Sequence, residues 1–293
     1  MPAPPRPILQ WTTFALLSLA WGSSFMFIKI GVTHTGPMTL VAGRLLIAWV
    51  AVSLLMLRAR VGLPRQKAEW GHLLFLGMLN SALPIFLISW GEQKIDSGMA
   101  AVVNSTVPIW TVLLAHLILH DEKLKAGRLL GVGIGFGGVL VLVGLPEVII
   151  GNQVLAGQVA VIVAAISYSL AAIYTRKFAP DLPYLRIIWV SLLSACLLTV
   201  TAALALEKPD LLHLHRASLI AMVWLGIIGT ALAFQLYYRL LAWWGAGRAT
   251  SVTYTFPVTG LVLGIIFLDE QLTLQTFLGS ALVLIGVIQT NRS

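Results

Sequence analysis

Polar and aromatic side chains interrupt the apolar runs of this chain where they could bind a small ligand. Those best suited to binding are Trp21, Ser23, Asn80, Asn104, Ser105, Trp110, Tyr168, Gln235, Tyr238 and Tyr254. Rings offer apolar surface, whereas amides and hydroxyls offer a few directed hydrogen bonds, as pockets for small, partly apolar ligands do. We expect the ligand's side chain to contact Trp21, Trp110, Tyr168 and Tyr254. We expect its polar head group to contact Asn80, Asn104, Ser105 and Gln235.

Two proline motifs lie inside long apolar runs. Thr106-Val107-Pro108 and Thr255-Phe256-Pro257 recur 149 positions apart. Proline kinks or opens a helix because it lacks an N–H group and clashes with the carbonyl four residues earlier. In lipid, such a break survives only against protein or a water-filled cavity. Neighbouring hydroxyls could simply repair each break, but the symmetric placement favours a central cavity. We therefore expect gating kinks at Pro84, Pro108 and Pro257.

Charged residues lie at the ends of the apolar runs, and no carboxylate lies in the middle of one. Ion-coupled carriers usually place an ionisable group inside the membrane, so the sequence argues against a cationic-drug antiporter and against tight proton coupling. Lys29 and Arg44 could attract an anionic group, or they could pair with Glu92 or reach the surface. We expect His116, inside an apolar run, to be neutral and packed. A neutral or zwitterionic ligand fits this distribution best.

The composition indicates a membrane protein. The chain is 58% hydrophobic and only 10% charged, whereas a soluble domain carries about 25% charged residues. The net charge of +8 comes from basic residues strung between apolar runs, which argues against a nucleic-acid partner. Cys196 is the only cysteine, which excludes an intrachain disulfide. We expect neither a metal nor another cofactor.

Ten apolar segments are long enough to cross a bilayer as helices, which takes about 20 residues each. Their ranges are 8–30, 38–58, 69–91, 97–119, 124–144, 155–176, 183–205, 216–239, 247–268 and 272–290. Strands are excluded because the runs lack the alternation of a membrane barrel. If the N-terminus is cytoplasmic, fourteen of the 19 lysines and arginines fall on the inner side. This bias obeys the positive-inside rule and predicts that both termini are cytoplasmic.

The chain repeats itself. Matches at the spacing of the proline motifs include Gly77 with Gly226, and Asp121-Glu122 matches Asp269-Glu270 after a one-residue slip. Each copy holds five expected spans, an odd number, so the second copy must enter the membrane upside down. The sequence therefore predicts an all-α membrane protein of ten transmembrane helices in two inverted five-helix repeats, residues 1–148 and 149–293. Paired repeats of this kind indicate a transporter.

Motifs for an enzyme are weak. Residues 133–138 contain a formal G-x-G-x-x-G, but no strand precedes them. Small residues at this spacing allow close helix packing instead, or a face for dimerisation. The chain lacks a matched nucleophile, base and metal set. A membrane-embedded enzyme is therefore the alternative from another functional class.

Several blocks together resemble a known family. Ala20-Trp21-Gly22-Ser23-Ser24-Phe25 with Lys29-Ile30-Gly31 resembles the opening of the EamA domain in the drug/metabolite transporter superfamily. Arg44-Leu45-Leu46-Ile47-Ala48 resembles its second helix, and Pro108 through Leu124 resembles its signature block. The second copy repeats that block around Pro257. Phe256 departs from the pattern, because an acidic residue often precedes this proline.

The resemblance implies a central path enclosed by spans 1–4 and 6–9, with the fifth and tenth spans outside as buttresses. It also implies export of amino acids, with the aromatic amino acid exporters the most similar branch. We expect a transporter in the bacterial inner membrane that is no enzyme and exports amino acids or related neutral or zwitterionic metabolites by alternating access. The alternative within transport is an organic-anion or nucleotide-sugar carrier. The expected partners are a small-molecule substrate and the lipid bilayer, in a monomer or weak homodimer.

Overall fold

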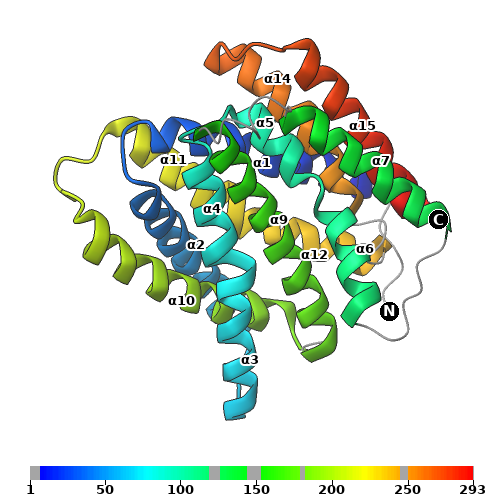
Figure 1. The fold of residues 1–293 in the computed structure, drawn as a ribbon. Helices are drawn as coiled ribbons and strands as arrows, with labels where there is room; N and C mark the ends of the chain where they lie inside the picture. The colour runs from blue at the N-terminus through cyan, green and yellow to red at the C-terminus, as the bar shows by residue number, and fades with distance from the viewer. Residues whose placement is uncertain (1–6, 119–125, 144–152, 179–181, 245–249, 293) are drawn as a thin grey trace.

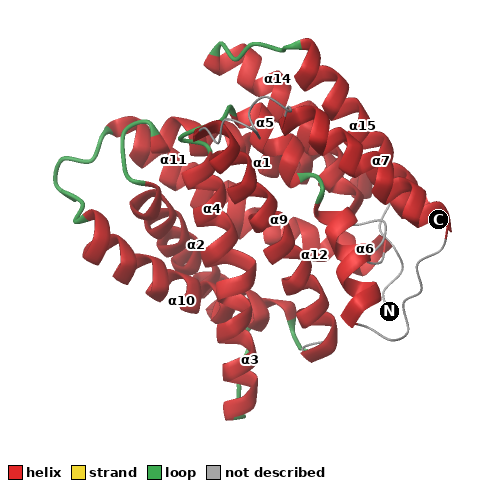
Figure 2. Ribbon diagram, in the orientation of Figure 1, coloured by secondary structure: helices red, strands yellow, loops and turns green. Residues whose placement is uncertain are grey.

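A computed structural model describes residues 7–118, 126–143, 153–178, 182–244 and 250–292, and every regular element in these ranges is a helix (Figure 2). The composition accounts for this, since the mean hydropathy is +0.92. A helix satisfies its own backbone hydrogen bonds and so needs no water to do so. The expected all-helical membrane fold is confirmed for the described residues.

Each of the ten expected ranges is mainly helical where it is described, although residues 105–106 form a turn within the range 97–119. The first half of the chain forms α1 (Pro7–Val32), α2 (Pro37–Ala59), α3 (Lys67–Gly77), η1 (Met78–Ala82), α4 (Leu83–Gly91), α5 (Ser97–Asn104), α6 (Val107–Ile118) and α7 (Ala126–Val143). The second half forms α9 (Gln153–Phe178), α10 (Tyr184–Ala202), η2 (Ala203–Glu207), α11 (Arg216–Gly226), η3 (Ile227–Leu232), α12 (Ala233–Trp244), η4 (Thr250–Thr255), α14 (Phe256–Leu268) and α15 (Leu274–Arg292). The matched pair Asp121-Glu122 lies outside the described residues.

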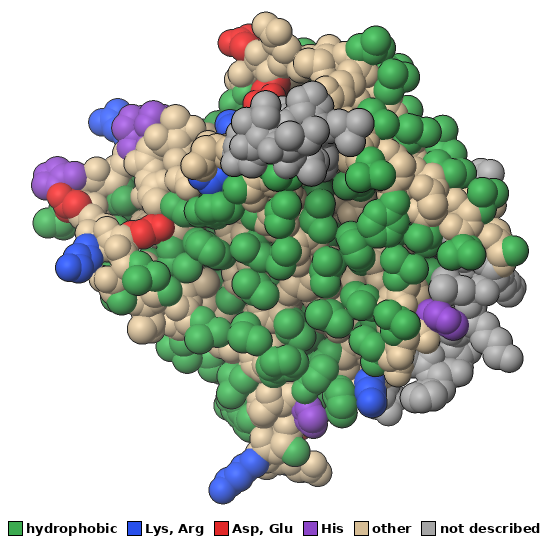
Figure 3. Space-filling view, in the orientation of Figure 1, with side chains coloured by type: hydrophobic (Ala, Val, Ile, Leu, Met, Phe, Trp, Pro, Cys, Tyr) green, Lys and Arg blue, Asp and Glu red, His purple; other side chains and the backbone are tan. Residues whose placement is uncertain are grey.

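Within the described residues, seven helical segments are long and apolar enough to cross a membrane. They are Pro7–Val32, Pro37–Ala59, Lys67–Gly91, Ser97–Ile118, Gln153–Phe178, Tyr184–Glu207 and Arg216–Leu241. Shorter apolar helices cover Leu129–Leu142, Val252–Leu268 and Leu274–Gln289. Large apolar side chains such as Leu54, Ile220 and Phe277 are more than half exposed. Hydrophobic side chains cover most of the face in Figure 3, and the charged ones lie toward its margins. Such a surface suits lipid and not water.

Interruptions of the helices recur at matching places in the two halves. A short π-helical turn, η1, precedes Pro84, and a second, η3, begins 149 residues after it at Ile227. Ala233 stands where the first half has Pro84, so the second π-turn forms without a proline. Such turns leave carbonyl groups without their usual helical partner and occur frequently at functional sites.

Glycines allow the two halves to pack closely. A Cβ atom on Gly226 of α11 would lie 2.8 Å from Cβ of Ile47 and 2.9 Å from the carbonyl oxygen of Arg44, both on α2. Its sequence match, Gly77 of α3, would collide in the same way with the carbonyl of Ser191 on α10. Each of these helices therefore crosses its neighbour nearly at backbone contact, which only glycine permits.

Helices α7 and α15 form a pair at one side of the bundle (Figure 1). A Cβ atom on Gly138 would lie 2.6 Å from the backbone nitrogen of Val283 and 2.9 Å from the carbonyl oxygen of Gly279. Part of the glycine run at 133–138 thus packs within the chain. Gly133 and Gly137 have nothing within 4 Å of such an atom.

The bundle has two distinct ends. The turns at residues 33–36, 92–96, 208–215 and 269–273 lie toward one end, at the top and left of Figure 1. Contacts between these turns and the neighbouring helices tie this end together, and we call it the clasped end. The start of α1 and the end of α12 meet at the opposite end, where Trp244 Nε1 donates to Gln10 Oε1 at 2.5 Å.

Candidate functional site

The predicted proline breaks are present. Helix α5 ends at Asn104 and α6 begins at Val107, so Pro108 is the second residue of a new helix. Pro257 is likewise the second residue of α14, after the 3₁₀ turn η4. The threonine hydroxyls bond in the same way at both breaks, because Thr106 donates to the carbonyl of Val103 and Thr255 to that of Val252, each at 2.7 Å. Whether the breaks act as gates stays a prediction.

The two breaks lie beside each other in the bundle. Helices α5 and α14 pack together, with Ala101 against Gly260 and Ser97 against Gly264. These two pairs run antiparallel, so the end of α5 and the start of α14 lie toward the same end of the helix pair. The Oδ1 atom of Asn104 is buried and has no hydrogen-bond partner. An unsatisfied amide oxygen at a helix break is available to a ligand that reaches it.

A cluster of rings surrounds the middle of α1. The ring of Trp21 lies 6.4 Å from that of Phe234, 5.4 Å from that of Tyr237 and 6.1 Å from that of Phe256, measured between centroids. Phe25, one turn further along α1, lies 5.9 Å from Phe256. We call these five residues the Trp21 cluster. It joins α1, α12 and α14, and its half-buried Trp21 offers an aromatic surface.

Arg44 is buried next to this cluster. Its guanidinium donates from Nε to the Thr230 hydroxyl at 2.9 Å and from NH2 to the Gly229 carbonyl at 3.3 Å. Both acceptors belong to the π-turn η3, where the freed carbonyl explains why an arginine can be held inside the bundle. A Cβ atom on Gly229 would lie 2.7 Å from the Ser24 hydroxyl, which is one turn from Trp21 on α1. Along α1, Trp21 is therefore about one helical turn from Ser24, the residue that lies beside the π-turn holding Arg44.

Lys29 and Glu92 lie near the clasped end. The ammonium of Lys29 donates to the carbonyl oxygens of Glu92 at 2.7 Å and Ile95 at 2.8 Å, where α4 ends. The carboxyl group of Glu92 is completely buried, and neither of its oxygens has a hydrogen-bond partner. The expected alternative, a pairing of Lys29 with Glu92, thus involves the main chain and not the carboxylate. Burial raises the pKa of Glu92 well above its ordinary value.

Two glutamates clasp the halves together at this end. Glu207, the last residue of η2, accepts hydrogen bonds from Met38 N at 2.9 Å, Thr39 N at 2.8 Å and the Thr39 hydroxyl at 2.6 Å. Glu270, after α14, accepts from Ser97 N at 2.7 Å and Gly98 N at 3.0 Å. Each carboxylate therefore caps the N-terminus of a helix in the other half, where free N–H groups favour an anion.

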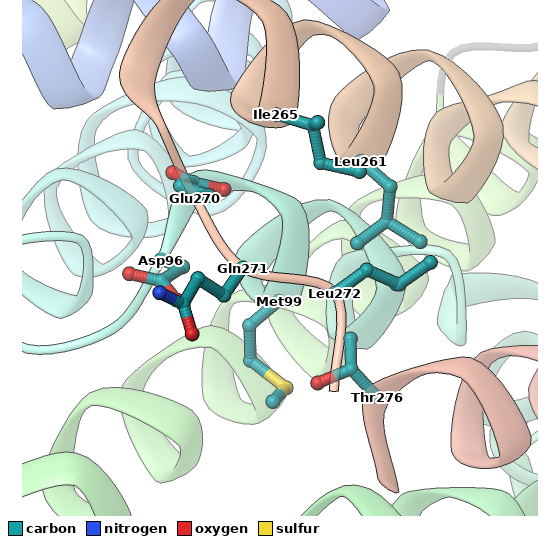
Figure 4. Close-up of a pocket in the computed structure, with 8 residues that line it drawn as sticks. All are labelled: Asp96, Met99, Leu261, Ile265, Glu270, Gln271, Leu272 and Thr276. Carbon is teal, nitrogen blue, oxygen red and sulfur yellow. The ribbon is translucent and has the colours of Figure 1, made fainter. Parts of the chain in front are cut away.

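A shallow pocket lies beside the second clasp. It is lined by Asp96, Met99, Leu261, Ile265, Glu270, Gln271, Leu272 and Thr276, as Figure 4 shows. The side chains of Asp96 and Gln271 lie next to each other at its edge, below Glu270. Burial raises the pKa of Asp96, and the nearby Glu270 raises it further. The pocket is at the clasped end and lies apart from the Trp21 cluster.

Comparison with known proteins decides the family. The sequence profile of the EamA-like transporter family matches residues 10–144 and, separately, residues 155–292. The chain belongs to the EamA-like transporter family. The expected membership is confirmed, and the chain is a membrane transporter with multiple passes.

Relatives of this EamA transporter are similar over most of their length. The uncharacterized transporter YoaV of Bacillus subtilis is 25% identical over 272 residues, or 92% of each chain. The uncharacterized inner membrane transporter YedA of Escherichia coli is 25% identical, covering 93% of this chain and 87% of YedA. A probable amino-acid metabolite efflux pump of Escherichia coli is 24% identical, covering 93% and 91%. A crystal structure with 21% identity has a TM-score of 0.67 and covers 97% and 96%, which shows a shared fold.

Some predicted binding residues of this EamA transporter use their polar groups in hydrogen bonds within the protein. The Ser105 hydroxyl donates to the Val102 carbonyl at 2.7 Å. Ser23 donates to the Ala20 carbonyl at 3.3 Å and accepts from Trp224 Nε1 at 3.2 Å. By contrast, Nε2 of Gln235 is buried without a partner. Asn80 is half-buried within η1.

The predicted aromatic residues do not all gather in one place. Trp110 packs edge-on against Phe136 of α7, with 4.9 Å between ring centroids. Tyr254 donates to the Val287 carbonyl of α15 at 3.4 Å. Tyr238 stacks on Tyr184 at 5.2 Å. Tyr168 on α9 lies within electrostatic range of Arg44. The structure thus joins Trp21 and Tyr168 to the region of Arg44, whereas Trp110 and Tyr254 contact the α7–α15 pair.

One expectation about charge needs correction in this EamA transporter. His116 was expected to be packed, but its side chain is exposed near the end of α6. Glu92 follows a span, as expected, and is completely buried where Lys29 donates to the turn at 92–96. A position at the end of an apolar run therefore does not imply exposure to water.

No sequence pattern assigned a binding role to Phe234, Phe256, Glu207 or Glu270. A phenylalanine in or beside an apolar run resembles any other core residue. The duplicated Asp-Glu pair did mark Glu270 as a repeated feature. No signal in the sequence connects Glu207 with α2, because the two are 168 residues apart.

Proposed function

We propose that this EamA transporter exports amino acids, aromatic ones among them, or related small neutral or zwitterionic metabolites. The observation that carries the proposal is the Trp21 cluster, in which Trp21 is about one helical turn from Ser24, beside the π-turn that holds the buried guanidinium of Arg44. The rings suit an apolar or aromatic side chain, and the guanidinium and free amide groups suit a polar head group. The relative from Escherichia coli, a probable amino-acid metabolite efflux pump, supports the same substrate class.

The proposed architecture has ten transmembrane helices in two inverted five-helix repeats, residues 1–148 and 149–293, with both termini cytoplasmic. The two separate matches of the family profile and the matching π-turns η1 and η3 support the repeat. The distribution of basic residues supports the orientation. In this arrangement the clasped end faces outward, and the binding region lies between the halves.

The proposed mechanism is alternating access around the proline breaks. A helix end at Pro108 and another at Pro257 give each half a point where it can bend without breaking further backbone hydrogen bonds. The clasps at Glu207 and Glu270 hold hydrogen bonds that must open before the substrate leaves at that end. Movement of one half against the other would exchange these contacts.

A transport assay tests the proposal. Purified protein in liposomes loaded with one unlabelled amino acid should accumulate the same labelled amino acid, and aromatic amino acids should compete best. Trp21→Ala should weaken competition by aromatic substrates more than competition by alanine, because it removes the ring at the centre of the cluster. Absence of accumulation for every amino acid would contradict the proposal.

An organic-anion or nucleotide-sugar carrier is the alternative within transport. Its supporting feature is the pair of cations Lys29 and Arg44, whose bonds to main-chain carbonyls an anion could replace. Exchange of labelled anions that is abolished by Lys29→Ala with Arg44→Ala would favour it.

The rival from another class, a membrane enzyme, would require product formation by the detergent-purified protein. We propose that the chain is no enzyme.

A further inference from the structure

Glu92 is a buried acid that the proposed substrate contacts do not use. It is completely buried, and neither oxygen of its carboxyl group has a hydrogen-bond partner. The turn around it is tight, since a Cβ atom on Gly91 would lie 2.9 Å from the carbonyl oxygen of Gly157 on α9. Burying an ionised carboxylate without a partner is strongly unfavourable, so such a group takes up a proton instead.

The neighbouring cations do not neutralise this carboxyl group directly. The charged and titratable groups around Glu92 and its neighbours are Lys29 on α1, Arg44 on α2, Tyr168 on α9, Asp96 in the same turn and Glu270 after α14. Lys29 directs its ammonium at two main-chain carbonyls. Arg44 directs its guanidinium at the π-turn η3. Glu270 adds a negative charge that opposes ionisation of Glu92.

Burial away from water has the largest effect on the pKa of Glu92. It raises the pKa of Glu92, and Glu270 raises it further, whereas Lys29 and Arg44 lower it. Opening of the clasped end would admit water and free Lys29 from the turn. Both changes favour the ionised form, so the acid should lose its proton when this end opens.

We propose that Glu92 is a proton-binding site that links closure of the clasped end to proton uptake: its carboxyl group is protonated when this end is closed and ionised when it is open. On closure, a proton from water at the clasped side forms an O–H bond with one carboxylate oxygen. On opening, that bond breaks and the proton returns to water at the same side. The site therefore makes closure sensitive to pH without requiring net movement of protons across the membrane.

The proposal rests on alternating access from the proposed function and not on the choice of substrate. Infrared spectroscopy of the purified protein at neutral pH tests it without any substrate. We expect the carbonyl-stretch band of a protonated carboxyl group, present in the native protein and lost in Glu92→Gln. Glu69→Gln is the matched control, because Glu69, unlike Glu92, has a direct partner, an ion pair with Arg186 at 3.1 Å. An identical band in native protein and Glu92→Gln would overturn the proposal.

Glu92→Gln should fold, because glutamine has nearly the shape of the neutral acid that it replaces. Failure of this variant to fold would also count against the proposal, since it would show that an ionised carboxylate is needed there. Absence of amino acid transport by the native protein would end the proposed substrate class and leave the infrared result unchanged.

Opening of the clasped end can be followed by thiol labelling. Ser97, at the start of α5, is completely buried, and Cys196→Ala removes the one native thiol. We expect a membrane-impermeant maleimide to label the cysteine of Ser97→Cys faster as the pH rises. The rate should rise more steeply in the protein that retains Glu92 than in the protein that also carries Glu92→Gln. Dividing the first labelling rate by the second cancels the intrinsic pH dependence of the thiol. A ratio that stays constant with pH would overturn the link to closure.

Discussion

At the scale of single residues, Arg44 is held by geometry that a lysine cannot reproduce. Its planar guanidinium reaches the Thr230 hydroxyl and the Gly229 carbonyl together. We expect Arg44→Lys to lower the stability of the purified protein by about 1–3 kcal/mol, because one acceptor in the π-turn loses its donor. Thermal unfolding in detergent would measure this. The exposed Arg58 of the same helix is the control, and an equal loss in Arg58→Lys would contradict the assignment.

The raised pKa of Glu92 predicts how stability changes with pH. The folded protein holds a proton there that the unfolded chain releases above the ordinary carboxylate pKa. This contribution to stability is therefore complete in acid and is lost as the pH rises toward the folded-state pKa. The loss is about 1.4 kcal/mol for each pH unit in that window. Thermal unfolding across pH should show a steeper decline in the native protein than in Glu92→Gln, and parallel curves would contradict this.

Individual residues were partly predictable. Trp21 and Arg44 could be singled out, Trp21 as an aromatic surface beside serines and Arg44 as a cation toward the end of an apolar run. Ser105 was expected to face a ligand, but its hydroxyl bonds its own helix, which is the usual local alternative for serine. The burial of Glu92 depends on Lys29 and on the turn at residues 92–96. No local sequence pattern around Glu92 indicates this burial.

At the scale of helices, the clasps depend on capping across the two halves. Glu207 accepts three hydrogen bonds at the start of α2. We expect Glu207→Gln to destabilise the protein by about 1–3 kcal/mol, since an amide offers one acceptor and no charge to these donors. Glu270→Gln should act similarly through α5. Unchanged thermal unfolding in both variants would show that neither clasp contributes to closure.

The close contact of α3 with α10 at Gly77 gives the sharpest prediction about helix packing. Gly77→Ala should destabilise the protein by about 1–3 kcal/mol, because the added methyl group would meet the main chain of Ser191. Gly71→Ala is the matched control in the same helix, where nothing lies within 4 Å of the added atom. Thermal unfolding of the two variants would show a large difference. Equal effects would mean that α3 and α10 do not cross at backbone contact.

Removal of a proline should affect movement more than folding. Pro108→Ala restores a backbone N–H group and favours one continuous helix from α5 into α6. We expect slower substrate exchange in liposomes with little change in thermal unfolding. Pro37→Ala is the control, because Pro37 begins α2 and interrupts nothing. Unaltered exchange in Pro108→Ala would remove the gating role.

Helix ranges could be read from the sequence because length and hydropathy decide them in a membrane. The breaks at Pro108 and Pro257 also followed from residue chemistry. The π-turn η3 could not be foreseen, since no proline accompanies it and its partner, the guanidinium of Arg44, comes from a helix 185 residues away in sequence.

At the scale of the whole molecule, the two halves are held together by contacts that neither half could make alone. Second-half carboxylates cap first-half helices, and a first-half arginine occupies a second-half π-turn. Repetition of the proline motifs pointed to two halves, but their mutual clasping required the fold. An arrangement of this kind can exchange one set of contacts for another while each half stays intact.

The most direct test of the account is efflux of labelled phenylalanine from preloaded liposomes that contain the purified protein. The account predicts efflux that is faster than from protein-free liposomes, is slowed by Trp21→Ala, and is retained in the Gly71→Ala control. Efflux no faster than from protein-free liposomes, for phenylalanine and for every other amino acid tested in the same way, would contradict it.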